Sequence, residues 1–545
     1  MPDLISRLVR IVGDRIAPNV RQMLNDRQPL IWLLAAVIGT VVGYAVWFFR
    51  VTIGTVQNLW LGHSGHDVVA TLASSKPWWL ILVVPALGGL LVGLYLQYAL
   101  PKRRPEGVAD VIEAKAIGGG RINFIHGLGS ALVAAVSLGA GASAGREGPA
   151  VHLGATLASG IHRHFQFSAA ARRMLLGCGV AAAVSASFNA PIAGVLFALE
   201  VILAHYALRA FIPIVIASVC ATLVTRNHLG DFPAFVLPEY QIESYWEFPA
   251  FALLGITCGA VAICFQFTVM STEWVARSVT CPLWLRPVVG GVMIGAIGVF
   301  VPEILGVGYE ATNGALTQKF SLIMLLVLLI AKTVATAITL SSRFGGGVFS
   351  PSLYLGAMTG GAFGIIAAWV FPEFASSNGL YAIVGMGAVA AAILGAPIST
   401  ALIVFELTLD YQVVIAVLPA ISLASGMMQA FHGQSFFHWQ LSQRGLFLHE
   451  GPHQQIVREI HVRDFLTPLS EEDMANPPIP AEDMPLLTPE DTLAAALRAF
   501  DAASHTRIPV VDGADTTRLL GWADHLTALD TYNNALVDAN VEEHR

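Results

Sequence analysis

The sequence predicts an all-α polytopic membrane protein with two inverted structural repeats, followed by a small α/β tail domain. Three observations support this prediction. The composition is strongly apolar, two motifs recur at offsets of 202 and 206 residues, and the charge changes abruptly near residue 450. Each observation points to a different part of the architecture: the spans, the repeats and the tail.

The membrane prediction follows from composition. Of 545 residues, 55% are hydrophobic and only 12% are charged, and the mean hydropathy is +0.65. A soluble chain of this length is far less apolar, and a spanning helix needs about 20 mostly apolar residues. Uncharged runs of that order are residues 29–49, 77–101, 122–145, 174–199, 248–272, 344–372, 375–405 and 411–431. Several are interrupted by Gly and Pro and are long enough for two shorter helices each.

The first 28 residues carry five Arg but no compact apolar core followed by a cleavage site, so we expect a cytoplasmic segment rather than a signal peptide. Lys102, Arg103 and Arg104 directly follow the second apolar run, as expected of an inside loop. We therefore predict an integral protein of the cell (inner) membrane with both termini in the cytoplasm. The five cysteines show no metal-ligand or disulfide spacing and are interpreted as small core residues.

The repeat prediction rests on two pairs of motifs. Residues 145–149 and 347–351 both read Gly-x-x-x-Pro, and both are followed by Leu-Gly-Ala, at 153–155 and 355–357. Ala-Pro-Ile at 190–192 recurs at 396–398, in each case followed by a Leu and then by Glu200 or Glu406. Two motifs at nearly one offset indicate internal symmetry, and many transporters are inverted repeats with the binding site between them.

Each Gly-x-x-x-Pro motif places its Pro near the start of an apolar segment, which is typical of the first turn of a helix. These helices are therefore predicted to begin inside the membrane. Irregular backbone at that depth is tolerated only where protein buries it or where it lines a cavity. Helix N-termini present unpaired N–H groups and the positive end of the helix dipole, and they attract anions.

Glu147 is the candidate functional residue. Glu147 and Arg146 are the only charged residues between positions 122 and 161, and a carboxylate so deep in a membrane usually has a function. One interpretation is structural, with Glu147 paired to Arg146 or capping the helix. The other is that Glu147 occupies an anion's position at the helix terminus and leaves it when protonated or displaced, which would link anion movement to pH.

These residues resemble those of the CLC family of chloride channels and proton-coupled chloride exchangers. The resemblance covers residues 29–445, and its motifs are Gly-Arg-Glu-Gly-Pro at 145–149, Gly-Val-Phe-Ser-Pro at 347–351, and the paired segments ending at Glu200 and Glu406. It implies a homodimer with one ion pathway in each subunit. It also implies that Glu147 is the gate and that the backbone N–H groups of Val348 and Phe349 bind the anion. Arg146 and Gly107 are further anion-binding candidates.

Three departures from the family pattern bear on mechanism. Residues 105–109 replace a stretch that usually supplies a serine hydroxyl, and Glu106 stands at the serine position. An acid there would repel an anion, so we expect Glu106 to point elsewhere, to be protonated, or to mark a rearranged site. Phe437 stands where the family has an anion-binding tyrosine. Val201 follows Glu200 where exchangers often have a proton-transferring glutamate, so Glu200 is either part of a proton path or a structural acid at a helix end.

Two other patterns are weaker. Gly-Ala-Ser-Ala-Gly at 141–145 fits a hydrolase nucleophile elbow, but it lies in an apolar stretch that we predict to be helical, where small residues indicate close helix packing. His63 and His66, with Asp67, could supply metal ligands, but the segment is interpreted as a polar loop. We predict neither an enzyme nor a bound metal or cofactor.

The tail, residues 446–545, forms a separate cytoplasmic domain in this prediction. From residue 450 it carries 18 acids and 6 Arg with no Lys. Strands are predicted at 462–466, 507–512 and 519–522. A helix capped by Thr488 is predicted through Phe500, and a last helix from Asp524. This order resembles a CBS domain, a regulatory module that can bind nucleotides, but its ribose-binding positions fall on Asp524 and Thr527.

The sequence thus predicts transport of an inorganic anion, with chloride favoured, gated by Glu147 and coupled to proton antiport. The alternatives are a passive chloride channel and, from another class, an anion sensor without flux. The expected partners are the anion, protons, membrane lipid and a second copy of the chain, with no nucleic acid.

Overall fold

The chain divides into two compact units, Met1–Gln440 and Leu441–Arg545. A computed structural model describes residues 20, 23–25, 27–63, 65, 68–163, 165, 167–231, 235, 245–372, 376–446, 457, 460–469, 484–503, 505–513, 515 and 518–544. Most of the predicted N-terminal segment 1–28, together with His66 and Asp67, lies outside these residues.

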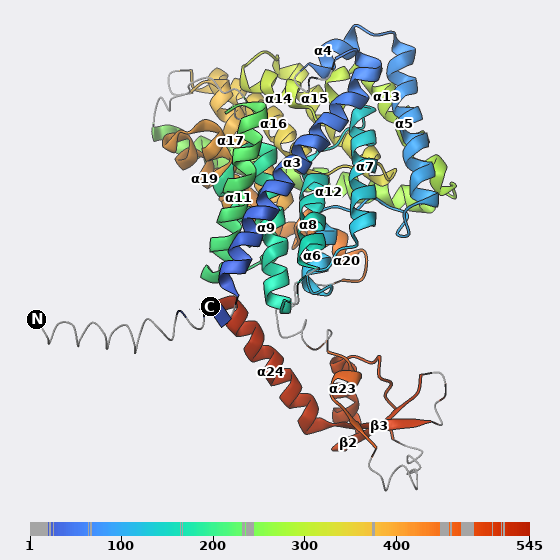
Figure 1. Ribbon diagram of the computed structural model, residues 1–545. Coiled ribbons are helices and arrows are strands. Elements are labelled where there is room, and N and C mark those ends of the chain that lie inside the picture. Colours follow the sequence, from blue (N-terminus) through green and yellow to red (C-terminus); the bar gives the residue numbers. More distant parts are fainter. Residues whose placement is uncertain are drawn as a thin grey trace, which may run out of the picture. The chain divides into compact units, whose positions relative to one another are not determined.

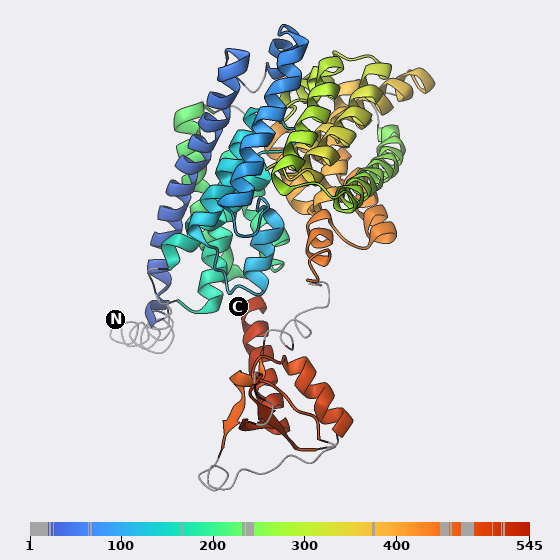
Figure 2. The same ribbon diagram turned by 90° about the vertical axis from the view of Figure 1, so that its right-hand side faces the viewer.

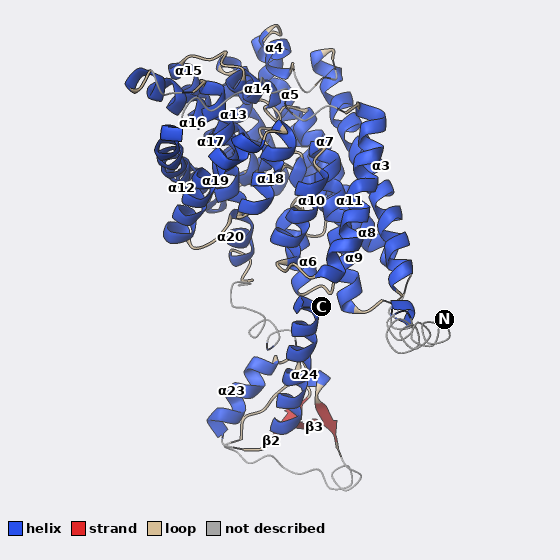
Figure 3. Ribbon diagram, turned by 90° about the vertical axis from the view of Figure 1, so that its left-hand side faces the viewer, coloured by secondary structure: helices blue, strands red, loops and turns tan. Residues whose placement is uncertain are grey.

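The first unit is helical throughout its described elements (Figures 1 and 3). Its α-helices are α3 (Gln28–Leu61), α4 (Val69–Ser74), α5 (Trp78–Tyr98), α6 (Val108–Ala116), α7 (Phe124–Gly139), α8 (Glu147–His162), α9 (Ala169–Phe188), α10 (Pro191–Phe197), α11 (Leu208–Leu229), α12 (Phe248–Ser278), α13 (Arg286–Phe300), α14 (Tyr309–Leu316), α15 (Leu322–Ser341), α16 (Phe349–Val370), α17 (Asn378–Leu394), α18 (Pro397–Thr408), α19 (Tyr411–His432) and α20 (Phe436–Ser442). A π-helical turn, Ala198–Leu203, continues α10.

The polytopic prediction is confirmed. Nine helices among the described residues are long and apolar enough to cross a membrane. Three of them were not among the predicted runs, namely α11, α15 and the segment Leu283–Phe300 that contains α13. The first two do not appear as uncharged runs in the sequence because each contains a basic residue. Arg209 lies at the start of α11, and Lys332 lies in the middle of α15.

The predicted division of long runs into two helices is also found. The run 174–199 contains most of α9 and all of α10, and the run 375–405 contains α17 and most of α18. The run 122–145 departs from the prediction, because only α7 forms there and residues 140–146 are not helical. The elbow-like Ser143 therefore lies in a buried loop, where its backbone N–H donates to Thr339 Oγ1 at 3.2 Å.

The two repeats are visible as two groups of helices. In Figure 2, the helices of residues 28–229 gather on one side and those of residues 248–432 on the other. Glycines at equivalent positions of the two repeats allow equivalent pairs of helices to pack closely. A methyl group on Gly154 would collide with the Gly179 carbonyl oxygen, and one on Gly356 would collide with the Gly385 carbonyl oxygen. The pairs α8–α9 and α16–α17 thus pack in the same way.

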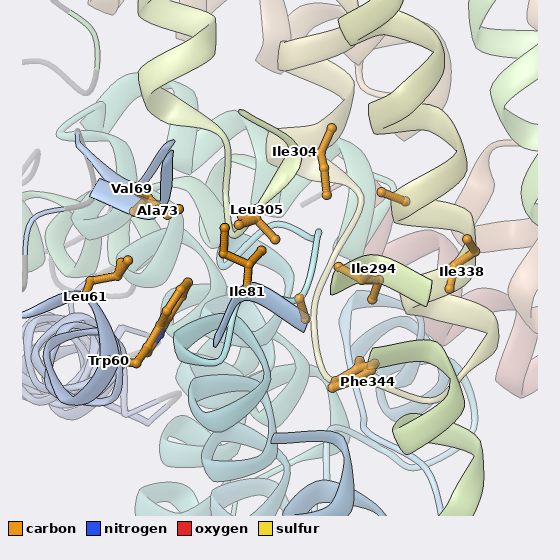
Figure 4. Packing of buried hydrophobic residues seen from close by; sticks show 12 residues of the cluster. Trp60, Leu61, Val69, Ala73, Ile81, Ile294, Ile304, Leu305, Ile338 and Phe344 are labelled. Atoms are coloured by element: carbon orange, nitrogen blue, oxygen red, sulfur yellow. The ribbon is translucent and has the colours of Figure 1, made fainter. Parts of the chain in front are cut away.

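An apolar cluster fixes the end of the unit that carries α4. Trp60 and Leu61 of α3 lie in one buried cluster with Ile81 of α5, Ile294 of α13 and Ile338 of α15 (Figure 4). The Trp60 indole N–H is satisfied by the Gly139 carbonyl oxygen at 2.9 Å. This cluster ties the first repeat to the second around the loops that precede α8 and α16.

The second unit contains a small antiparallel sheet of order β1–β3–β2, which confirms the predicted α/β tail. The elements are β1 (Leu466–Pro468), α23 (Leu493–Ala503), β2 (Arg507–Val511), β3 (Leu519–Asp524) and α24 (His525–His544). Two predicted boundaries were wrong. Val462–Asp464 is a 3-10 turn, and Thr488 bonds to Asp491 while Thr492 caps the later-starting α23.

Candidate functional site

Glu147 is the first residue of α8, and its side chain is fully buried. Pro149 lies in the first helical turn, where a missing N–H removes no helical hydrogen bond. Gly145 must be small because a Cβ atom there would lie 2.9 Å from the Ser350 backbone nitrogen. The motif therefore allows the start of α8 to approach the start of α16.

The two repeats meet at equivalent residues. Gly145 N–H donates to the Gly347 carbonyl oxygen at 2.7 Å, and Gly347 N–H donates to the Gly145 carbonyl oxygen at 2.8 Å. This antiparallel bridge joins the loops that lead into α8 and α16. Two helix N-termini, with their positive dipole ends, thus begin beside one another in the interior of the unit.

The Glu147 carboxylate lies between these helix ends. Tyr309 Oη, at the start of α14, donates to Glu147 Oε1 at 2.7 Å. Ser350 Oγ, in the first turn of α16, donates to Glu147 Oε2 at 2.5 Å. Each carboxylate oxygen therefore accepts one hydroxyl hydrogen bond, and both donors belong to the opposite repeat. Hydrogen bonds to a charged acceptor are stronger than those between neutral groups, so these two contacts hold the side chain at the helix ends.

Arg146 is buried against the same group. Its guanidinium lies 4.7 Å from the centroid of the Tyr309 ring, and its Nε atom lies 3.7 Å from Glu147 Oε1. Within the described part of the chain, its Nε and Nη1 atoms have no hydrogen-bond partner. The ion pair that the structural interpretation expected is thus present, but it is longer than the two hydroxyl contacts.

Val348 and Phe349, the proposed backbone anion ligands, stand where α16 begins. The Phe349 ring packs between two rings of the first repeat, with centroids 4.9 Å from Phe188 and 5.8 Å from Phe197. Because the first N–H groups of a helix have no partner within the helix, this packing fixes the direction in which the start of α16 presents its donors.

Gly107 lies just before α6, which begins close to α8. A Cβ atom on Gly148 would lie 3.9 Å from Val108 Cγ2. The Gly107 N–H, a candidate anion donor, is already bonded to Asp110 Oδ2 at 2.9 Å. In this conformation Gly107 contributes space beside the site rather than a free N–H group.

Glu106 points elsewhere, as one of the sequence alternatives stated. Its Oε1 atom lies 2.7 Å from Lys102 Nζ, and its Oε2 atom lies 3.5 Å from His152 Nε2.

Phe437 is 5% exposed and meets the Phe436 ring edge-on, with centroids 6.2 Å apart. Neither position supplies a hydroxyl group, as the sequence indicated.

Glu200 and Glu406 cap helices reciprocally across the repeats. Glu406 accepts from the N–H groups of Ile192 and Ala193 at 2.9 and 2.7 Å, at the start of α10. Glu200 accepts from the N–H groups of Ile398 and Ser399 at 3.0 and 2.7 Å, at the start of α18. This geometry favours the structural interpretation of both acids, because both carboxylate oxygens are engaged.

Sequence reasoning missed Tyr309, Ser350 and Lys332. Ser350 belongs to the motif 347–351, but nothing in that motif indicates a contact with Glu147. Lys332 is fully buried, and its Nζ atom donates to the carbonyl oxygens of Ile304 and Gly306 at 3.0 and 2.9 Å. It thereby supports the loop that leads to Tyr309. No local pattern around Tyr309 or Lys332 indicates these contacts, which join distant segments.

The two predicted ribose-binding positions of the tail are Asp524 and Thr527. Asp524 pairs with Arg507 Nε at 2.7 Å and accepts from Thr467 Oγ1 at 3.3 Å, so the carboxylate at this ribose-binding position is engaged within the sheet. Thr527 lies in α24. Among the residues that the structure describes, no group of His, Cys, Asp and Glu is arranged to hold a metal ion.

The family model described as "Voltage gated chloride channel" matches residues 88–429. A Ralstonia nicotianae protein, named as a ClcB-like chloride channel protein, is 34% identical over 71% of this chain and 91% of its own length. An H⁺/Cl⁻ exchange transporter, ClcA of Salmonella paratyphi B, is 30% identical over 78% of this chain and 92% of its own.

Solved structures agree in fold. A slow cyanobacterial Cl⁻/H⁺ antiporter superposes with a TM-score of 0.68 at 21% identity, covering 76% of this chain and 97% of its own.

Proposed function

The chain belongs to the voltage-gated chloride channel (CLC) family, and on that premise we propose that it moves chloride or a similar inorganic anion across a membrane in exchange for protons at Glu147. One observation carries the proposal. A buried carboxylate lies between the starts of α8 and α16 and accepts one hydroxyl hydrogen bond on each oxygen.

The same donors suit an anion. When Glu147 is ionised, its carboxylate is the anion that Tyr309, Ser350 and the helix ends stabilise. When Glu147 is protonated, it loses its charge and the attraction of the helix dipoles, and it leaves. An inorganic anion then takes its position, held by the Ser350 hydroxyl and the N–H groups of Val348 and Phe349.

Exchange follows from this competition. An anion and an ionised Glu147 cannot occupy one position together, because two like charges so close repel strongly. Each anion that enters therefore requires a proton on Glu147, and each anion that leaves lets Glu147 return and release its proton. Anions and protons move in opposite directions when Glu147 takes its proton from the side to which the anion leaves and releases it to the other side.

The cellular setting is part of the proposal. The protein is a transporter rather than an enzyme, it spans the cell (inner) membrane as a homodimer with a separate pathway in each subunit, and both termini face the cytoplasm. The acidic tail regulates transport or contributes to dimerisation. The positive residues 102–104, directly after α5, support this orientation.

The test uses purified protein in vesicles loaded with chloride. An outward chloride gradient is expected to drive protons uphill into the vesicles, and Glu147→Gln is expected to abolish proton movement while chloride still flows. Glu310→Gln is the matched control, since Glu310 accepts from Ala70 N–H at 2.7 Å at the start of another helix, α4. Chloride flux without uphill proton movement in the unaltered protein would instead identify a passive channel, and no flux would identify a sensor.

A further inference from the structure

We infer that Glu106 and His152 form a proton-uptake site that supplies Glu147 from the α6 end of the helical unit. The inference rests on the proton exchange proposed above and names the groups through which protons enter. Figure 1 shows α6 at the end of the unit opposite α4, where the Lys102–Arg104 loop also lies. By the proposed orientation this is the cytoplasmic end.

The first support is a line of side chains that runs from the surface to the interior. Lys102 is half exposed, and its Nζ atom lies 2.7 Å from Glu106 Oε1. The Glu106 side chain is 7% exposed, and its other oxygen lies 3.5 Å from Nε2 of His152, whose side chain is 2% exposed. The charge at the surface is therefore connected to a buried imidazole through a single carboxylate.

The second support is a cavity that reaches both groups. It has a volume of about 270 Å³, enough for several water molecules. Glu106 and His152 both line it. The other titratable or charged residues of its wall are Lys102, Asp110, Glu113, Arg121 and His126. Water in this cavity can bring a proton to the pair.

The third support is the state of His152 itself. In the described part of the chain its Nε2 atom has no hydrogen-bond partner, although the residue is 1% exposed. A buried polar nitrogen without a partner is costly. A proton at Nε2 would turn the 3.5 Å contact with Glu106 into an ion pair. Burial holds the pKa of the His152 imidazole below its usual value; Glu106 and Asp110 act in the opposite direction, and Lys102 and Arg104 lower it further.

The pair is also placed to reach Glu147. His152 and Glu147 lie on the same helix, about 7.5 Å apart along its axis and about 140° apart around it, so a proton must pass between them through water. Glu106 precedes Gly107 and Val108, the segment that lies against Gly148. Glu200, the acid that the sequence suggested for this role, has both carboxylate oxygens engaged by the start of α18.

The transfer balances without any redox partner. A proton from cavity water binds Glu106, passes to His152 Nε2 across the 3.5 Å contact, and then passes, through water, to the Glu147 carboxylate. His152 returns to the neutral imidazole and Glu106 to the carboxylate. The next proton comes from the cavity.

The test measures the ratio of protons to chloride in vesicles for the full-length protein. Glu106→Gln and His152→Gln keep the shape of each side chain as closely as possible and remove its proton-accepting role. Each is expected to lower proton uptake per chloride at least 10-fold while chloride movement continues. Glu113→Gln, on the wall of the same cavity, is the matched control and should keep the ratio of the unaltered protein.

Three outcomes are informative. If the unaltered protein drives protons uphill and both variants keep its ratio, the uptake site is wrong while the proposed exchange stands. If the unaltered protein moves no protons uphill, both proposals fail. If one variant does not fold, as judged by gel filtration, the other decides. Lys102→Gln adds a check at the surface, because loss of this cation should move the pH at which proton uptake is half-maximal upward.

Discussion

Replacing Tyr309 by Phe tests whether the hydroxyl contacts hold Glu147 in the pathway. The change removes one oxygen atom from a buried ring and with it the 2.7 Å bond to Glu147 Oε1. Ser350→Ala removes the other bond, to Oε2. Both variants leave the carboxylate itself in place, so they separate its positioning from its chemistry.

The magnitude follows from the nature of these bonds. A hydrogen bond to a charged group contributes about 1.5–3 kcal/mol, and we take the lower end because one hydroxyl bond remains in each variant. A loss of about 1.4 kcal/mol corresponds to one pH unit. The ionised form loses this stabilisation, so Glu147 should be protonated at higher pH. Half-maximal chloride flux is therefore expected about 1 unit higher in each variant.

The assay is chloride efflux from vesicles across a series of pH values. Tyr381→Phe is the matched control, because Tyr381 donates to another glutamate, Glu247, at 3.0 Å, and its loss should leave the profile unshifted. If Tyr309→Phe and Ser350→Ala both keep the original profile while Glu147→Gln removes the pH dependence, these hydroxyls do not hold the gate closed and our reasoning is refuted.

Three further predictions concern the supports of the site. Glu406→Ala should lower the free energy of unfolding by about 3 kcal/mol, because two charge-assisted bonds to the start of α10 are lost. Thermal denaturation in detergent measures this change, and an unchanged midpoint would show that Glu406 does not stabilise α10. Lys332→Met should shift the pH profile of flux in the same direction as Tyr309→Phe, since two bonds to the loop before Tyr309 disappear. A lower stability with an unshifted profile would show that Lys332 does not position Tyr309. Gly154→Ala should cost about 1–3 kcal/mol through overpacking against α9, whereas Gly426→Ala, whose Cβ atom would meet nothing within 4 Å, should be tolerated in the same melting experiment.

Much of the architecture could be predicted because membrane insertion and internal repetition leave strong local signals. The spans followed from uncharged runs, and the equivalence of Glu147 and Phe349 followed from a shared motif. The misses have a common physical cause. Lys332 made α15 look too polar to span, yet its Nζ atom donates to two carbonyl oxygens of residues 26 and 28 positions earlier in the chain.

The hydrogen-bond partners of Glu147 could not be predicted from local sequence patterns for the same reason. Tyr309 lies 162 residues away and Ser350 lies 203 residues away. The contact of Glu106 with His152 likewise joins residues 46 positions apart in the sequence. Sequence spacing placed the helix ends, but the side-chain contacts depend on how the two repeats face one another.

The reciprocal caps also have a consequence for biosynthesis. The start of α10 depends on Glu406, which is 214 residues further along the chain than Ile192. At about 5–20 residues per second, a ribosome needs roughly 10–40 s to make that stretch. During this interval the N–H groups of Ile192 and Ala193 lie in the nascent first half without their acceptor, and the second half in turn arrives needing Glu200. A first half that is released early is therefore expected to be less stable than the complete unit, because the start of α10 lacks its cap.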